Sequence, residues 1–534
     1  MKKILALSLA LVLFGSMLSG CGQKIDNSGY VPTGDALLME GQDPDDLLPE
    51  EENTQELALA YYPTNSMNPI YGSNYTNRVL MSLMYQPLFA VDNSKVATPI
   101  LAANYRVYSG GRTWVVYLES GARFSDGTPV TNEDVVATYL KAMENDYYKG
   151  RFKYHLSKVQ LSDDGGVAFY LNSPFENLAL LLDVPILKAG EVDYDGIEQI
   201  PVGSGPYTMS MGSGGAYLQR NHSWWCGDAE VAATDEAIEL VEVSTPAEVR
   251  DEFQFGKVSL ACTNPMSGSF AEYRCDYELW EIESGYFLYI GCNIQWSDFY
   301  PENHPLRAFL TYGIDRETYV SDIYRGLVDP VTLPCSPREI SYNKTLASKY
   351  GFDSMKFLNE LASFHIPTKD GGGEKELRIL VNSEDSARVQ IARNLAASLT
   401  ELGMKATTME HSGTAYQGVL VNGNYDIYLG LTRLPPTMDL SEFFRPWGEM
   451  SWGGLSHESL AGMCDRAMEN SGNFYNLYQK VAEDGRIIPV AFGYYIVYAQ
   501  RGVLPKLNPS RDNVFYYSLG KNMTDAQLPV EETE

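Results

Sequence analysis

The stretch RFSDGTPVTNEDVVATYLKAM, Arg123 to Met143, places a polar turn directly before a segment with helical spacing. Its Asp-Gly dipeptide is typical of a turn. The side chain of Thr131 can accept a hydrogen bond from the amide of Asp134, which predicts a T-x-x-D form of the capping box. Glu133 and Asp134 then lie in the first helical turn, where the helix dipole favours negative charge. We therefore interpret these carboxylates as a turn and a helix start, and not as an acidic active site.

Two helices are predicted around this stretch from the spacing of apolar residues. The helix after Thr131 is expected to pack through Val135, Val136, Tyr139, Leu140 and Met143. An earlier helix is expected to pack through Val79, Leu80, Leu83 and Met84 and to stop before Pro87. The first strand of the folded body is predicted at Leu57–Pro63.

Later in the chain, strands and a helix alternate. ELRILV (Glu376–Val381), MKATTM and YDIYLGL (Tyr425–Leu431) are predicted strands, and SARVQIARNLAASLTELG is a predicted helix closed by Gly403. This order predicts an α/β domain with a mostly parallel sheet. Ligands of such sheets bind at the carboxyl ends of strands, which points to the loops after Tyr62 and Leu431. Because these loops are more than 350 residues apart, a site shared by both would lie between domains.

The length of 534 residues predicts two to four folded units of roughly 100 to 200 residues each. With 44% hydrophobic and 20% charged residues, the composition is that of a globular protein. The chain has 37 tyrosines. Tyrosines of this number suit either core packing or a wet cleft that binds varied ligands, and both uses remain open.

The first residues predict an export signal. Lys2 and Lys3 precede an apolar run too short to span a bilayer, and LSGC ends at Cys21. This pattern resembles the bacterial lipoprotein signal, which implies a lipid on Cys21; an ordinary secretory signal is the alternative. The acidic segment that follows, up to Glu56, has no periodicity and is predicted to be a flexible tether. The expected location is therefore the extracytoplasmic face of the cell membrane, reached through the lipid anchor.

Charge and cysteine content limit the partners. Removal of the leader with its two lysines takes the formal net charge from −29 to −31, and such a charge disfavours nucleic acid and anionic lipid headgroups. Six cysteines follow Cys21, and no dense disulfide framework is visible. Cys262 with Cys275 is a possible pair, and buried free thiols are an alternative of at least equal weight.

No catalytic or metal signature is found. The sequence lacks a G-x-S-x-G elbow, a phosphate-binding loop and an H-E-x-x-H helix, and its six histidines are scattered. His222 with Cys226 offers only two ligands, which is too few for zinc. We therefore predict no enzyme, no cofactor and no metal site, and favour a binding protein.

The stretch FSDGTPVTNEDV, Phe124 to Val135, closely resembles a signature of the family 5 extracellular solute-binding proteins, the oligopeptide, dipeptide and nickel receptors of ABC importers. Further matches follow in the family's order, namely MYQPLF, PILAANY, VGSGPYTM, LQRNHSWW and HPLRAFLTYGIDRETYVSDIYRG. The resemblance extends from about Leu57 to Leu504. It implies a two-lobed α/β fold of the periplasmic-binding-protein type (class II), with an extra subdomain in the first lobe and a ligand cleft between the lobes.

The resemblance also implies domain boundaries. The chain is expected to cross between the lobes near Tyr286–Asn293 and near Pro489–Tyr498. The expected segments are a lipoprotein signal at 1–20, a tether at 21–56, lobe I at 57–288 with a subdomain at about 78–198, lobe II at 289–490, and a return to lobe I with a tail at 491–534.

Ligand residues are predicted from position. Peptide-binding members carry a tryptophan and an aspartate in the loop after the second-lobe strand, and the aspartate holds the peptide amine; here Leu431 and Leu434 fall near these places. Arg433 would favour a carboxylate or another anion if it faces the cleft, and a solvated arginine is the alternative. The predicted ligand-binding residues are Tyr61, Asn65, Asn68, Tyr85, Arg433, Asp439, Trp447 and Trp452.

The leading functional hypothesis is a lipid-anchored receptor that binds a peptide or peptide-like solute and delivers it to the permease subunits of an ABC importer by lobe closure. It is expected to be a monomer that contacts the membrane only through its lipid. The alternatives are a receptor for a signalling peptide or for a non-peptide solute such as a nickel chelate or a sugar, an extracytoplasmic hydrolase, and a surface adhesin.

Overall fold

The computed structural model describes residues 56–227, 229–267, 273–297, 306–363 and 376–530. The predicted leader, Cys21 and the tether up to residue 55 lie outside the described residues. Within the described part of the chain, no helix combines the length and the apolar character needed to cross a membrane.

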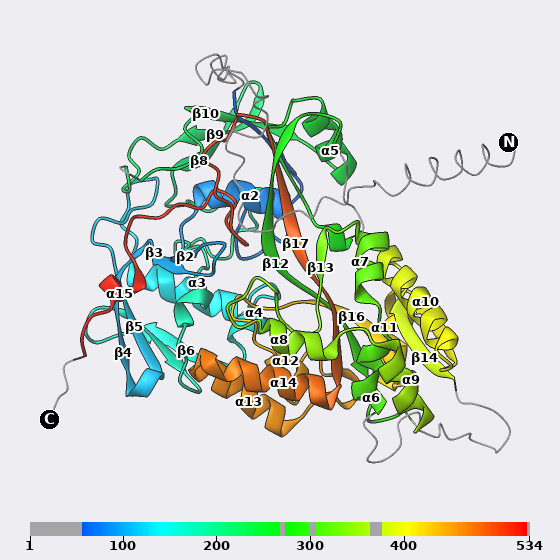
Figure 1. The fold of residues 1–534 in the computed structure, drawn as a ribbon. Coiled ribbons are helices and arrows are strands. Elements are labelled where there is room, and N and C mark those ends of the chain that lie inside the picture. Colours follow the sequence, from blue (N-terminus) through cyan, green and yellow to red (C-terminus); the bar gives the residue numbers. More distant parts are fainter. Residues whose placement is uncertain (1–55, 228, 268–272, 298–305, 364–375, 531–534) are drawn as a thin grey trace, which may run out of the picture. The chain divides into compact units, whose positions relative to one another are not determined.

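Eleven strands form one large mixed sheet, in the order β15-β14-β16-β12-β17-β11-β1-β10-β9-β8, with β13 paired to β17 (Figure 1). The strands are β1 (Ala58–Tyr61), β8 (Tyr207–Gly212), β9 (Gly215–Arg220), β10 (Ala237–Glu242), β11 (Leu260–Thr263), β12 (Tyr277–Cys292), β13 (Val328–Pro330), β14 (Leu377–Asn382), β15 (Ala406–His411), β16 (Ile427–Arg433) and β17 (Ile487–Gln500).

The β-α-β prediction is confirmed, since β14 pairs in parallel with both β15 and β16. The predicted mostly parallel sheet is wrong. Strand β12 lies antiparallel to both β16 and β17, and β17 lies antiparallel to β11. The apolar run of each strand indicated burial, but burial alone does not fix strand direction.

Strands β12 and β17 lie side by side along most of their length (Figure 1). They contribute to different hydrophobic clusters at their two ends. Tyr494, Ile496 and Tyr498 of β17 pack with the β1 and β11 side, whereas Ile488 and Val490 pack with α10. The pairing register shifts between Glu283 and Phe287, so the ladder is interrupted between these two clusters.

Two smaller sheets follow β1. One is the hairpin β2 (Phe89–Val91) and β3 (Ala97–Pro99). The other is a four-stranded antiparallel sheet, in the order β4-β5-β7-β6, made of β4 (Ala102–Tyr108), β5 (Thr113–Leu118), β6 (Leu156–Leu161) and β7 (Val167–Leu171).

The helices are mostly short. The α-helices are α2 (Tyr75–Met84), α3 (Asn132–Glu144), α4 (Lys149–Phe152), α5 (Pro246–Gln254), α6 (Leu306–Phe309), α7 (Arg316–Tyr324), α8 (Lys344–Ala347), α9 (Ser354–Ala362), α10 (Ser386–Glu401), α11 (Gly413–Asn422), α12 (Ser441–Phe444), α13 (Glu458–Glu469), α14 (Phe474–Asp484) and α15 (Met523–Ala526). Short 3-10 helices lie at Ser109–Gly111, Leu178–Leu181, Pro265–Ser267, Leu310–Gly313, Ser348–Tyr350, Trp452–Gly454 and Ser471–Asn473.

The predicted capping box of α3 is confirmed. Thr131 accepts from the Asp134 amide, and the Asp134 carboxylate accepts from the Thr131 amide at 2.8 Å. Val135 and Tyr139 are fully buried, as predicted, but Leu140 is 48% exposed and Thr138 is buried in its place. Tyr139 packs edge-on against Phe169 of the four-stranded sheet, at 5.0 Å between ring centroids. Because Thr138 exchanges hydrogen bonds with the backbone of Leu187, a polar side chain is satisfied on the buried face.

Asp134 does more than cap α3. Its second carboxylate oxygen accepts from the amide of Ala189 at 2.8 Å and joins the helix start to a distant loop. We expect Asp134→Ala to lower the free energy of unfolding by about 2 kcal/mol and Thr131→Ala by about 1 kcal/mol, because the first change removes more hydrogen bonds. Urea denaturation would measure both. Glu133→Ala, at an exposed position in the same turn, is the control; equal losses for all three variants would contradict this role.

The possible disulfide is not formed. Cys262 and Cys275 are both free thiols in the structure. Burial raises the pKa of the Cys262 thiol, which disfavours its reactive thiolate form.

Candidate functional site

Strand β16 ends at Arg433, next to the interrupted register of β12. The guanidinium Nε of Arg433 donates to the carbonyl of Ser284 at 2.8 Å. Its Nη2 pairs with Asp512 Oδ1 at 2.7 Å, and its Nη1 donates to the hydroxyl of Tyr147. The side chain is 17% exposed. Arg433 is therefore a mostly buried cation that ties three distant segments of the chain together, and not a solvated loop arginine.

Aromatic rings surround this cation. Tyr75, the first residue of α2, stacks on Tyr495 of β17 with 3.9 Å between ring centroids. The Arg433 guanidinium lies 5.9 Å from the Tyr495 ring and 5.3 Å from the Tyr147 ring. Tyr495 thus contacts both the start of α2, which follows the loop after β1, and the end of β16.

Asp512 is the centre of a charge network. Besides Arg433, it pairs with Arg151 at 3.0 Å, and Arg511 Nε lies 3.7 Å away. Burial opposes ionisation of this carboxyl, but the arginines outweigh burial and hold its pKa well below the usual range. Asp512 is consequently ionised at neutral pH. Its negative charge compensates the positive charges of several buried guanidinium groups.

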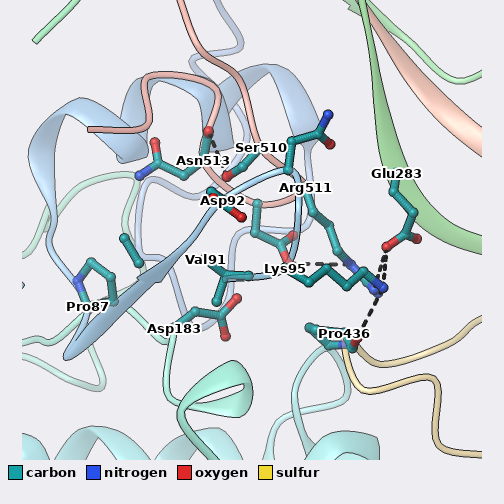
Figure 2. A pocket seen from close by; sticks show the side chains of 13 residues that line it. Pro87, Val91, Asp92, Lys95, Asp183, Glu283, Pro436, Ser510, Arg511 and Asn513 are labelled. Atoms are coloured by element: carbon teal, nitrogen blue, oxygen red, sulfur yellow. Dashed lines mark hydrogen bonds and ion pairs between the residues drawn. The ribbon is translucent and has the colours of Figure 1, made fainter. Parts of the chain in front are cut away.

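A pocket adjoins this network, between the β2–β3 turn, β12 and the loop after β16 (Figure 2). Its empty volume, open mouth included, is about 470 Å³. It is lined by Pro87, Ala90, Val91, Asp92, Asn93, Lys95, Asp183, Glu283, Pro436, Ser510, Arg511, Asp512 and Asn513.

Lys95 reaches into this pocket from the β2–β3 turn, where its φ is +60°. Its ammonium lies 2.8 Å from Glu283 Oε2, donates to the carbonyl of Pro436 at 3.0 Å, and also pairs with Glu339. Burial opposes ionisation of Glu283, but Lys95 and Arg511 outweigh burial and lower its pKa. The pocket therefore contains charged groups of both signs that are largely withdrawn from water.

The four predicted residues near β1 are buried or hydrogen-bonded within the protein. Tyr61 is buried at the end of β1. Asn65 accepts through its carbonyl from Asn77, and Asn68 binds the carbonyls of Val192 and Tyr194. The Tyr85 hydroxyl contacts the carbonyls of Met67 and Pro201. Asn68 and Tyr85 thus both hold the loop after β1, and their role in ligand binding stays a prediction.

Asp439 lies apart from Arg433. Its Oδ2 is 2.7 Å from His155 Nε2, and both side chains are about 95% buried. Burial opposes its ionisation, yet His155 and Ser441 lower its pKa. The ligand role predicted for Asp439 stays a prediction, although its hydrogen-bonding capacity is already used by these two partners.

The two predicted tryptophans differ in exposure. Trp447 is 92% exposed with a positive φ of +65°, and its carbonyl accepts from Lys153 Nζ at 3.0 Å. Trp452 is partly buried in a short 3-10 helix. Their predicted role in ligand binding stays a prediction as well.

Sequence reasoning missed most of the charged network. Lys95, Arg151, Glu283, Arg511 and Asp512 carry no motif. The one available signal is Glu283, a single acid inside the apolar run IESGYFLYIGC of β12. Among the described residues, no group of three or more His, Cys, Asp and Glu side chains is placed to hold a metal ion.

The chain is similar in sequence to known solute-binding proteins. The model of the bacterial extracellular solute-binding proteins, family 5 (middle part), matches residues 97–454. The oligopeptide-binding protein AppA of Bacillus subtilis is 24% identical over 465 residues, which are 80% of this chain and 83% of AppA. The glutathione-binding protein GsiB of Escherichia coli K12 is 23% identical over 277 residues, covering 50% of this chain and 53% of GsiB.

Solved structures share the fold. The putative peptide binding protein AppA of Clostridium difficile has a TM-score of 0.68 at 17% identity, with 86% of this chain and 98% of that chain covered. NikA of Brucella suis in complex with Fe(III)-EDTA has a TM-score of 0.65 at 15% identity, with 84% and 95% covered. The predicted two-lobed architecture of the periplasmic-binding-protein type is confirmed by these likenesses.

Proposed function

The chain belongs to the family 5 bacterial extracellular solute-binding proteins, and from this premise we propose that it is a lipid-anchored receptor that delivers peptides or peptide-like solutes to an ABC importer. Members of the family are substrate-binding proteins of ABC transporters, so the chain binds its solute and does not convert it. The lipid on Cys21, the extracytoplasmic membrane location and the monomeric state are parts of the proposal that rest on the sequence.

One observation supports the site more than any other. The ends of segments far apart in the chain meet at Arg433, where the β12–β17 ladder is interrupted. A break in two long paired strands is a suitable place for lobes to rotate, because a few residues absorb the change in dihedral angles. We place the lobe boundaries near residues 288 and 490, and closure would then act on the pocket beside this break.

The charges beside the break bear on the solute. Arg433 and Arg511 supply guanidinium groups, and Leu434 stands where an acid would favour an ammonium. A carboxylate on the solute is therefore the group we assign to this side of the site. Tyr61, Asn65, Asn68, Tyr85, Asp439, Trp447 and Trp452 remain proposed contributors to the cleft.

A non-peptide solute is the second candidate. NikA, which shares the fold, was solved with Fe(III)-EDTA, a compact polycarboxylate chelate. One carboxylate of such a solute could accept hydrogen bonds from Nε and Nη1 of Arg511, which form no hydrogen bond within the protein.

Solute binding can be tested on the mature chain by native mass spectrometry of what co-purifies, followed by thermal shifts with peptide pools. We expect a peptide at 100 times its Kd to stabilise the protein by about 2.7 kcal/mol, because it binds only the folded state. Peptides with an amidated C-terminus are the matched control and are expected to bind more weakly. Stabilisation by a chelate and by no peptide would favour the second candidate, and no stabilisation by any solute would contradict both.

The anchor is tested separately. Cys21→Ser is expected to release the protein from the membrane fraction and to remove the lipid mass from its N-terminus. A wild-type N-terminus without lipid would contradict this part of the proposal and would leave solute binding untouched.

A further inference from the structure

The pocket of Figure 2 contains buried polar atoms that the protein itself leaves without hydrogen-bond partners. Arg511 Nε and Nη1, Glu283 Oε1 and Asn513 Oδ1 are buried and form no hydrogen bond. The two Arg511 nitrogens face Asp512 and Glu283 only at ion-pair distances of 3.7 and 3.6 Å. Arg511 is 7% and Glu283 4% exposed. Unpartnered polar atoms at this depth are costly, so a bound group that satisfies them is favoured. The pocket therefore favours a bound group that both accepts and donates hydrogen bonds.

The charges around the pocket nearly balance. Asp92, Asp183, Glu283 and Asp512 line it together with Lys95 and Arg511. Arg151 and Arg433 reach Asp183 and Asp512 from outside the pocket, and Glu339 reaches Lys95. A solute group with a net charge would leave one buried charge without compensation, which is unfavourable in a poorly hydrated site. A group without net charge fits better.

The guanidinium group of Arg511 and the carboxylate of Glu283 lie close together in the pocket. Arg511 Nη1 lies 3.6 Å from Glu283 Oε2, beyond hydrogen-bond distance. In an α-amino acid, the ammonium nitrogen and the carboxylate carbon share one carbon and lie about 2.5 Å apart. The two ends of a peptide are separated by a further ~3.3–3.6 Å for each added residue. A single zwitterionic head group can thus contact both Arg511 and Glu283 at once, whereas the two ends of an extended peptide cannot.

We propose that this pocket binds the zwitterionic head group of an α-amino acid or of a small amino-acid-derived solute. The carboxylate accepts from Arg511 Nε or Nη1, and the ammonium donates to Glu283 Oε1. A zwitterion is preferred over a neutral amide because both partners in the protein are charged, and charge-assisted hydrogen bonds are the stronger ones. This assignment rests on the proposed solute-binding function and narrows its solute class.

The test compares solutes that differ by one charge. Isothermal titration calorimetry on the mature chain would use free α-amino acids, the N-acetyl form and the amide of each, and pentapeptides with free ends. We expect at least one free amino acid to bind, and its N-acetyl form and amide to bind on the order of 10- to 100-fold more weakly, since each has lost one charge-assisted contact.

Variants locate the binding in the chain. Glu283→Gln keeps side-chain size, whereas Arg511→Gln shortens the side chain. Each removes one charge and is expected to weaken zwitterion binding on the order of 10- to 100-fold. The matched controls are Glu410→Gln and Arg393→Gln, which make the same changes in an exposed ion pair and are expected to leave binding unchanged. If a charge variant fails to fold, the comparison of the free amino acid with its N-acetyl form and its amide on the wild-type chain still tests the assignment.

The binding results distinguish a failure of the head-group assignment from a failure of the receptor function on which it rests. If pentapeptides bind and no free amino acid does, the head-group assignment is overturned and the receptor function stands. If amino acids bind equally to wild type, Glu283→Gln and Arg511→Gln, the site lies elsewhere and the assignment is also overturned. If neither class of solute binds and no co-purifying solute is found, both proposals fail.

Discussion

Asp512→Ala is expected to lower the free energy of unfolding by about 3–5 kcal/mol, because it leaves buried guanidinium groups without their shared anion. Arg433 and Arg151 pair directly with this carboxylate, and their side chains are only 17% and 6% exposed. Water cannot solvate these buried guanidinium groups in place of the carboxylate. The expected loss of stability therefore exceeds what a surface ion pair contributes. Urea denaturation followed by circular dichroism would measure it.

Asp251→Ala is the matched control, since Asp251 forms an exposed ion pair with Arg250. We expect that change to cost no more than about 1 kcal/mol. A loss of that size at Asp512 would show that the arginines are satisfied without it, and the charge network would lose its assigned centre.

The same carboxylate gives wild type a specific response to acid. Its pKa is depressed in the folded state, so its contribution to stability is fully present above the unfolded pKa of about 3.9 and is lost as the pH falls toward the folded pKa. The difference in stability between wild type and Asp512→Ala should therefore shrink progressively below about pH 4. A difference that stays constant down to pH 3 would contradict this linkage.

Local rules predicted much of the fold. The capping box of α3, the apolar face of α2 and the β14-α10-β15 unit follow from hydrogen-bonding groups and periodicity within short segments. The errors came from information that short segments lack. Leu140 has the spacing of a core residue, yet the buried face is rotated toward Thr138 and Ala142 by what the helix packs against. Strand direction in β12 depends likewise on partners far along the chain.

The candidate site was predictable only in part. Arg433 was singled out because it lies in the loop predicted after Leu431, beside the positions where the family resemblance places ligand-binding residues, and the structure makes it part of a buried network. Its partner Asp512 lies 79 residues away in a segment without regular structure, and no spacing rule connects the two. The pocket is built in the same manner from turns and strand positions that meet only in three dimensions. Residue type indicates what a side chain can do, but tertiary contact decides which groups are left to bind a solute.

Gly285→Ala is expected to damage both stability and solute binding, because Gly285 lies at the break in β12 with a φ of +78°. A Cβ atom there would lie 2.6 Å from the carbonyl oxygen of Leu434 and 2.3 Å from Nη2 of Arg511. The backbone conformation alone costs about 1–3 kcal/mol for a residue with a side chain. The clash adds a further cost of about 1–3 kcal/mol, since a backbone carbonyl must move.

Gly326→Ala separates these two contributions. Gly326 has a φ of +77°, and a Cβ atom there would meet nothing within 4 Å, so that variant carries the conformational cost without the clash. We expect Gly285→Ala to be the less stable variant by at least about 1 kcal/mol in urea denaturation, and to be alone in weakening solute affinity, because only its new methyl group displaces Arg511 from the pocket. Equal stability of the two variants, with unchanged affinity in both, would mean that the break in β12 does not position Arg511.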